Sequence, residues 1–164
     1  MKGKPIFVAV ITILMLTISV CVVVISRLSK TKKAVNDIMG RYKDYYNLVL
    51  TWFLNKNTGF SIAKAILDSG YKDIAIYGMG TIADILLDEL EGSEINVRYL
   101  IDKTVDNGGK HLENRLCIGL YAISDQETVD AIIVTPVAFF DEIASDLHAI
   151  GVNTEIISLD EFIY

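Results

Sequence analysis

The sequence predicts an α/β fold: a small doubly wound parallel sheet of strand order 3-2-1-4-5, preceded by one transmembrane helix and an amphipathic helix. Three observations predict this architecture. An uncharged apolar segment lies near the N-terminus, short apolar runs alternate with helix-periodic segments further on, and a glycine-rich turn follows the first of those runs. The expected parts are a membrane anchor (1–27), an amphipathic helical linker (28–58) and one α/β domain (59–164).

The membrane anchor is predicted from Pro5 to Ser26, which carry no charge and are mostly Ile, Val and Leu. At about 1.5 Å per residue these positions form about 33 Å of helix, enough to cross a hydrocarbon core of about 30 Å. A cleavable signal peptide is the alternative. Its apolar region would be about 7–15 residues long and would end at a small-x-small site. The longer run here ends in Ile25-Ser26-Arg27, and an uncleaved anchor is favoured.

The cations that flank this segment indicate its orientation. Lys2, Lys4 and the terminal amine precede it, and four cations follow it: Arg27, Lys30, Lys32 and Lys33. Positive charge is enriched on the cytoplasmic side of membranes, so the C-terminal domain is expected in the cytoplasm. The basic run could also rest on anionic lipid headgroups.

The remainder of the chain is acidic. Residues 34–164 contain nine Lys and Arg against 21 Asp and Glu, a formal charge of −12. Nucleic-acid binding depends on neutralising phosphates, so nucleic acid is excluded as a partner. Cys21 in the membrane segment and Cys117 in the domain do not form a disulfide framework, and no His/Cys spacing predicts a metal site.

An amphipathic helix is predicted from Leu28 to Leu54, a segment without proline and with Gly40 as its one glycine. Large apolar residues recur there at helical spacing. They are Ile38, Tyr42, Tyr45, Tyr46, Val49, Trp52 and Phe53. This stripe is expected to pack on the domain or on a partner chain, and the segment Asn55–Gly59 ends the helix.

The α/β domain is predicted as a series of alternating elements. Apolar runs predict strands at 73–77, 97–101, 117–121, 131–135 and 155–157. Helical periodicity predicts helices at 62–69 (capped by Ser61), 81–90 and 139–150. Residues 104–115 are polar and glycine-rich and are expected to form a loop, while Ser124–Glu127 and Ser158–Glu161 resemble capping boxes. Right-handed crossovers then give the order 3-2-1-4-5, with helices on both faces.

The main functional signal is Gly78-Met79-Gly80-Thr81-Ile82-Ala83, a G-x-G-x-x-A sequence between a predicted strand and a predicted helix. In a Rossmann-like site the first glycine permits the tight turn and the second lets the backbone approach a pyrophosphate. Ala83 is small enough for close packing of the helix on the strand. Gly78, Met79, Gly80 and Thr81 are therefore expected to hold phosphate at the helix N-terminus. The alternative is a structural turn without a ligand.

Further candidate ligand contacts lie at the ends of two other strands. Asp102 ends the second strand, 22 residues after Gly80, where an acid can accept hydrogen bonds from ribose hydroxyls. This favours NAD or a nucleotide-sugar as the ligand. The neighbouring cation of Lys103 keeps a ligand with a 2′-phosphate, such as NADP, as an alternative. Thr135, before Pro136, lies next to the expected switch point and could bond a ligand or only end the strand.

No catalytic residue is identified. Tyr99 and Lys103 have the Y-x-x-x-K spacing of short-chain dehydrogenases, but that chemistry needs both side chains on one helix face. Here the pair runs along a strand, so it is rejected. His111 is a candidate for ligand contact, and His148 is expected on a helix surface.

Several segments resemble the small Rossmann-like domains of bacterial surface-polysaccharide biosynthesis proteins. The resemblance covers about residues 55–164 and is carried by five segments: Gly59–Ser61, Gly70–Lys72, Ile74–Gly80, Ile101–Asp102 and Val129–Pro136. Similar modules precede the catalytic parts of nucleotide-sugar epimerase/dehydratase-like proteins and sialic-acid-type sugar acyltransferases. The resemblance implies a nucleotide or nucleotide-sugar site at Gly78, Gly80, Ala83 and Asp102, and a bacterial inner-membrane protein. Because no catalytic domain is attached here, autonomous catalysis is not expected.

The sequence therefore leads to a first hypothesis: a membrane-anchored module that binds a nucleotide, dinucleotide or nucleotide-sugar, accessory to envelope polysaccharide biosynthesis and working with a partner enzyme. Two alternatives remain. One is an NAD-dependent sugar-modifying enzyme completed by a partner or a homodimer. The other is a non-binding interaction protein that recruits its partner through the Tyr- and Trp-rich helix.

Overall fold

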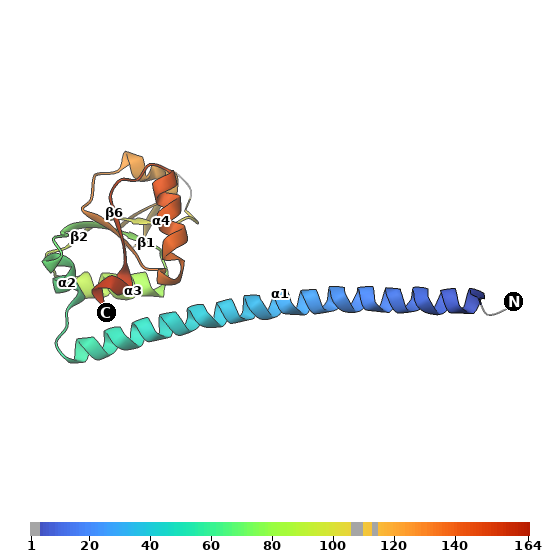
Figure 1. The fold of residues 1–164 in the computed structure, drawn as a ribbon. Helices are drawn as coiled ribbons and strands as arrows, with labels where there is room; N and C mark the ends of the chain where they lie inside the picture. The colour runs from blue at the N-terminus through green and yellow to red at the C-terminus, as the bar shows by residue number, and fades with distance from the viewer. Residues whose placement is uncertain (1–3, 106–109, 113–114) are drawn as a thin grey trace. The chain divides into compact units, whose positions relative to one another are not determined.

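The computed structural model describes residues 4–105, 110–112 and 115–164 (Figure 1). The chain divides into two compact units, Met1–Asp44 and Tyr45–Tyr164. Helix α1 (Lys4–Asn57) supplies the described part of the first unit and the beginning of the second. The two units are considered separately below.

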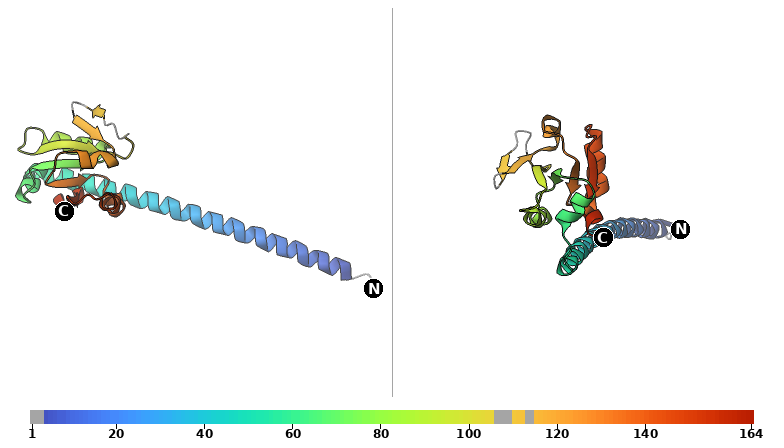
Figure 2. Two further views of the ribbon diagram at one scale, coloured as in Figure 1. Left: turned by 90° about the horizontal axis from the view of Figure 1, so that it is seen from above. Right: turned by 90° about the vertical axis from the view of Figure 1, so that its left-hand side faces the viewer.

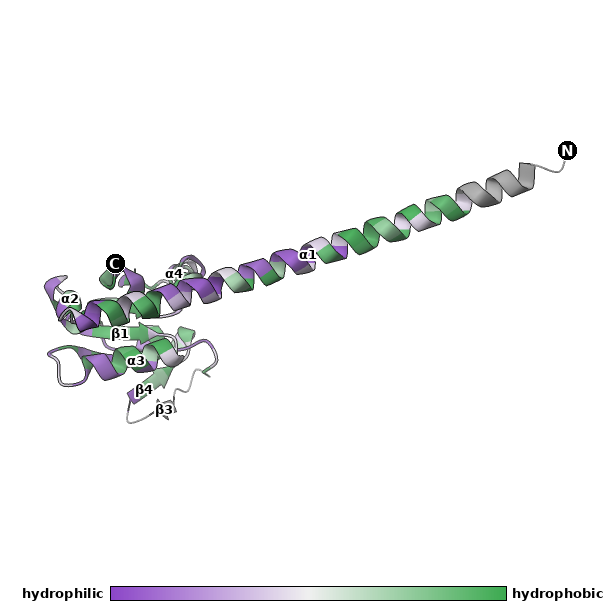
Figure 3. Ribbon diagram, turned by 90° about the horizontal axis from the view of Figure 1, so that it is seen from below, coloured by the Kyte–Doolittle hydropathy of each residue, from purple (hydrophilic) through white to green (hydrophobic). Residues whose placement is uncertain are grey.

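The first unit is helical, and its apolar part agrees with the predicted anchor. From Thr12 onward α1 contains a window of mean hydropathy 2.1, none of it buried, so by length and composition this helix can cross a membrane. Figure 3 shows the change along α1 from continuous apolar colour to a mixture of polar and apolar residues. The membrane segment and the amphipathic helix are one continuous helix. Lys2, one of the orientation cations, lies outside the described residues.

The second unit is an α/β domain. Its α-helices after α1 are α2 (Ile62–Asp68), α3 (Thr81–Leu90) and α4 (Phe140–Ala149). Its strands are β1 (Asp73–Tyr77), β2 (Asn96–Ile101), β3 (Lys110–Leu112), β4 (Arg115–Ile118), β5 (Ala131–Val134) and β6 (Glu155–Ser158). In the described part of the domain, the 3₁₀ helices η1 (Leu120–Asp125) and η2 (Val137–Phe139) join these elements, and η3 (Leu159–Phe162) follows β6.

The sheet has the order β3-β4-β2-β1-β5-β6. Five of these strands run parallel, and counted along the chain they have the predicted order 3-2-1-4-5. Strand β1 is central, and its last residue, Tyr77, pairs with Ile101 of β2 and Val134 of β5. The three strands therefore end side by side, which places the residues that follow them at one edge of the sheet.

Apolar side chains cover both faces of the sheet, as alternation along buried parallel strands requires. One face, with Ile74 and Ile76, packs against α2, α3 and the end of α1. The other face, with Ala75 and Tyr77, packs against η1 and α4. Figure 2 shows α3 and α4 on opposite sides of the sheet. The domain thus has two cores separated by a single sheet.

The last turns of α1 belong to the domain core. Leu48 and Trp52 are 1% and 4% exposed and pack among the residues of α2 and α3, and Asn55 donates a hydrogen bond to the carbonyl of Ile163 over 2.8 Å. The compact unit therefore starts at Tyr45 rather than at residue 59. Leu48 is absent from the predicted apolar stripe, whereas Tyr42, Tyr46 and Phe53 of that stripe are at least 60% exposed.

Three local predictions are wrong. Lys110–Leu112 forms β3, antiparallel to β4, so residues 104–115 are not a loop throughout; 106–109 and 113–114 lie outside the described residues. The strand predicted at 117–121 is β4, which ends at Ile118 because Leu120 and Tyr121 belong to η1. Ser124–Glu127 is no capping box, since η1 ends there instead of a helix beginning.

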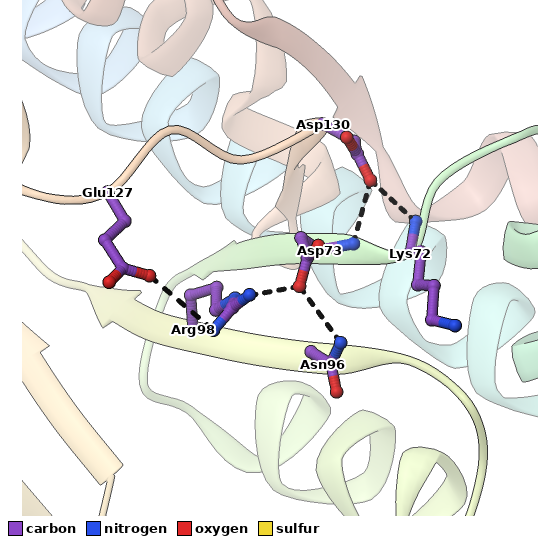
Figure 4. A network of polar contacts seen from close by, with 6 residues as sticks. All are labelled: Lys72, Asp73, Asn96, Arg98, Glu127 and Asp130. Atoms are coloured by element: carbon purple, nitrogen blue, oxygen red, sulfur yellow. Dashed lines mark hydrogen bonds and ion pairs between the residues drawn. The ribbon is translucent and has the colours of Figure 1, made fainter.

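A polar network closes the opposite, amino-terminal edge of the sheet (Figure 4). The Asp130 carboxylate accepts hydrogen bonds from the backbone N–H groups of Lys72 and Asp73, both at 2.8 Å. The Asp73 carboxylate accepts from Asn96 at 3.0 Å and from Nε of Arg98 at 2.8 Å. These contacts join the starts of β1, β2 and β5.

The Asp130 contacts predict a pH dependence of stability. The N–H groups of Lys72 and then Asp73 lower the pKa of Asp130 below its ordinary value. A carboxyl with a lowered folded pKa stabilises the fold fully above its unfolded pKa of about 3.9, and this contribution is lost as the pH falls through the lower folded value. Asp130→Asn should therefore reduce the loss of stability in that acidic window. Urea unfolding at a series of pH values measures this. If the free energy of unfolding of Asp130→Asn falls with pH as steeply as that of the wild type, the prediction is contradicted.

Candidate functional site

The predicted site residues meet at the carboxyl edge of the sheet. Gly78, Asp102 and Thr135 each follow directly after one of the three paired strand ends. Backbone bonds extend the ladder by one step, because Gly78 N–H donates to the carbonyl of Ile101 at 2.8 Å and Thr135 N–H to that of Tyr77 at 3.0 Å. Parallel α/β sheets bind their ligands at this edge, where helices leave the central strands in different directions.

Gly78 is required by the fold. Its φ is +101°, in the region that side chains rarely adopt. A Cβ at this position would lie 2.7 Å from Oγ1 of Thr135 and 2.9 Å from the Pro136 ring. The first glycine of the motif is thus explained by backbone conformation and by close packing of the neighbouring strand end.

Gly80 differs from Gly78 in both respects. Its φ is −96°, which any residue adopts, and a Cβ built on it would meet no atom within 4 Å. Gly80 is the N-cap of α3, and no side chain caps this helix. The N-terminus of α3 therefore opens outward, where unpaired N–H groups and the helix dipole favour an anion. Thr81 is exposed there, and Ala83 is buried against the sheet as predicted.

Asp102 is bonded within the protein. One carboxylate oxygen accepts from Met79 N–H at 3.1 Å, and the other accepts from Thr104 N–H at 2.8 Å and from its hydroxyl at 2.6 Å. A carboxylate offers about four lone-pair positions, so about one remains for a further donor. Asp102 therefore holds the glycine turn in place and could still accept a hydrogen bond from one hydroxyl.

Thr135 and Lys103 lie differently with respect to solvent. Thr135 is 2% exposed, and its hydroxyl donates to the Tyr77 carbonyl at 3.0 Å, so its proton is already used. Lys103 is exposed beside Asp102. Met79 turns its side chain inward, where its sulfur accepts from the Cys117 thiol. A ligand could therefore meet the backbone of residue 79 but not its side chain.

Negative charge surrounds the end of β1. Burial raises the pKa of Tyr77 above its ordinary value, and the carboxylates of Asp102, Asp146 and Glu142 raise it further. Tyr77 is therefore a neutral phenol at physiological pH. The same carboxylates oppose a highly charged anion at this edge.

Two cavities lie away from this edge of the sheet. A cavity of about 220 Å³ is lined by Tyr99 and by the segments that precede β5 and β6, at the opposite edge of the sheet. A second cavity of about 510 Å³, lined by Arg98 and Arg115, lies at the start of β2. Within the described residues, no group of three or more His, Cys, Asp or Glu side chains could hold a metal ion.

Sequence reasoning missed one side chain that shapes the site, that of Thr104. Thr104 closes a turn on Asp102, and its signal is the Asp-x-Thr spacing typical of such turns. Pro136, expected to shape the loop after Thr135, packs where a side chain on Gly78 would lie. His111, a further candidate for ligand contact, belongs to β3.

The fold and this edge define an α/β domain with a parallel sheet and a glycine-rich turn from its central strand into a helix. Residues 70–158 match the family model described as C2185-like, N-terminal. The match covers more than half of the chain, and the chain belongs to this family. It includes every predicted site residue from Gly78 to Thr135. No curated protein matches the chain.

Proposed function

We propose that this chain is a membrane-anchored binding module whose Rossmann-like domain holds a nucleotide, dinucleotide or nucleotide-sugar. The phosphate would lie at the N-terminus of α3, against the backbone of Gly80 and Thr81, and Asp102 would accept a hydrogen bond from the ribose. The proposed setting, with a partner enzyme of bacterial envelope polysaccharide biosynthesis and the domain in the cytoplasm, rests on the sequence resemblance and the flanking cations.

The observation that carries the proposal is the contrast between the two glycines. Gly78 is explained by its φ and by Thr135 and Pro136, whereas neither conformation nor packing requires a glycine at position 80. A serine or aspartate at an N-cap would stabilise the helix more than glycine does. A ligand that approaches the backbone closely would explain why the position lacks a side chain.

The negative charges at this edge narrow the range of expected ligands. The carboxylates of Asp102, Glu142 and Asp146 all act on Tyr77 at the end of β1. A pyrophosphate diester, as in NAD or a nucleotide-sugar, carries less negative charge than a triphosphate or a dinucleotide with an additional 2′-phosphate. We therefore expect NAD or a nucleotide-sugar to bind more tightly than ATP or NADP.

Gly80→Leu tests the site with little disturbance of the fold. The new side chain points into open space, so stability should change by less than about 1 kcal/mol. The leucine side chain would occupy the position of the phosphate. The affinity for NAD or a nucleotide-sugar should therefore fall at least about 100-fold, which corresponds to about 2.7 kcal/mol of binding free energy. Isothermal titration calorimetry of the full-length protein in detergent measures the affinity.

Asp88→Leu is the matched control, because Asp88 is exposed further along α3 and away from the turn. Unchanged affinity in Gly80→Leu would refute the proposed site. Asp102→Ala is a weaker test, since it also removes the acceptor for Met79 N–H and Thr104. That loss should cost about 1–3 kcal/mol of stability regardless of any ligand.

A further inference from the structure

An exposed apolar stripe runs along α1 beyond the apolar segment. We define this stripe by its six members: Val35, Met39, Tyr42, Tyr46, Val49 and Phe53. Each is between 39% and 70% exposed. The stripe contains no charged residue.

The stripe is separate from the face of α1 that packs on the domain. Tyr46, Val49 and Phe53 come one residue after Tyr45, Leu48 and Trp52, respectively, and Leu48 and Trp52 are buried in the core. One residue rotates the direction of a side chain by about 100° around a helix. The domain core therefore accounts for one face of the helix and leaves the stripe uncovered.

The spacing of the stripe is that of a coiled coil. Successive members are separated by four, three, four, three and four residues, the alternation of the inward a and d positions of a heptad. A second helix with the same period matches it along its whole length, and another copy of this chain supplies such a helix.

We propose that the stripe pairs with the same stripe of a second copy in a parallel, two-stranded coiled coil. The proposed membrane anchor sets the direction, because two copies inserted the same way present their stripes in parallel and at the same height. The period also continues back to Lys32 and Leu28. A single lysine at an inward position is a device that fixes register and chain number.

The area that two copies would bury and the charges beside the stripe both suit pairing with a second copy of the chain. If each of the six members buries on the order of 100 Å², the two copies together would bury about 1,200 Å², the lower end of stable specific interfaces. The positions beside the stripe add no like-charge pair, because Lys43 of one chain would face Ile38 of the other. Apart from Lys32, which would face Lys32 of the other copy, the seam brings no two like charges together.

Disulfide cross-linking in isolated membranes tests the pairing. Cys21 is exposed and Cys117 is buried, so the full chain is used with Cys21→Ser. In that background Tyr42→Cys should give a reducible dimer under mild oxidation, because facing positions of a coiled coil lie within the roughly 7 Å that a disulfide bridges. Asp44→Cys, on the outer side of the same turn, is the matched control and should stay monomeric.

Mass measurement of the detergent-solubilised protein gives a second readout. The wild type should have twice its chain mass of 18.2 kDa, and Tyr46→Glu should be monomeric while Asn47→Glu remains dimeric. Trp52, the single tryptophan, reports by its fluorescence whether each variant is folded. A monomeric wild type, equal cross-linking at positions 42 and 44, or a cross-linked product with a different protein would overturn the proposal.

Discussion

Gly78→Ala is expected to lower the free energy of unfolding by about 3 kcal/mol. A side chain at φ +101° costs roughly 1–2 kcal/mol. Its Cβ would also lie 2.7 Å from Oγ1 of Thr135 and 2.9 Å from Pro136, and overpacking of this kind costs roughly 1–3 kcal/mol. For a domain of this size the midpoint of thermal unfolding, Tm, should fall by about 12 °C. Circular dichroism of the variant measures it.

Gly92→Ala separates the two causes. Gly92 also has a positive φ, +74°, but a Cβ there would meet no atom within 4 Å. This variant should lose only about 1 kcal/mol. If Gly78→Ala is no more destabilising than Gly92→Ala, then the residues after β5 do not pack against Gly78 as closely as the structure shows.

Leu48→Ala is expected to cost about 3 kcal/mol, because Leu48 is 1% exposed and lies in the core beside α2 and α3. Removing a buried leucine side chain leaves a cavity that surrounding residues fill only partly. Trp52, one turn further on, should become more exposed, with a red-shifted fluorescence. Chemical unfolding followed at Trp52 measures both effects.

Asn47→Ala is the control for this change, since Asn47 is exposed on the same turn. It should change stability by less than about 0.5 kcal/mol. Equal stability of the two variants would mean that the end of α1 is only a linker to the domain, in disagreement with its place in the core.

The central elements of the sheet could be predicted from sequence, and the polar edge could not. β1 and α3 have their predicted bounds, because an unbroken apolar run and a strong helical period meet at Gly78–Gly80. β3 was missed because a three-residue antiparallel edge strand has no apolar signature. In α1, apolar residues occur on two faces, so periodicity alone could not tell which face enters the core.

The candidate site was predictable in its position but not in its internal bonding. Parallel strands that end together bring Gly78, Asp102 and Thr135 to one edge, and this follows from strand order alone. The hydrogen bonds that use the Asp102 carboxylate and the Thr135 hydroxyl depend on side-chain directions that spacing does not give. Those bonds shift the expected ligand contacts toward the backbone at Gly80 and Thr81.

Thermal unfolding of the full-length protein in detergent, with NAD, NADP, ATP, UDP-sugars and CDP-sugars, tests the central claim most directly. A ligand at about 100 times its dissociation constant should add about 2.7 kcal/mol and raise Tm by about 10 °C. The account predicts such a rise with NAD or a nucleotide-sugar, and its disappearance in Gly80→Leu. No rise with any of these ligands, or the same rise in Gly80→Leu, would contradict it.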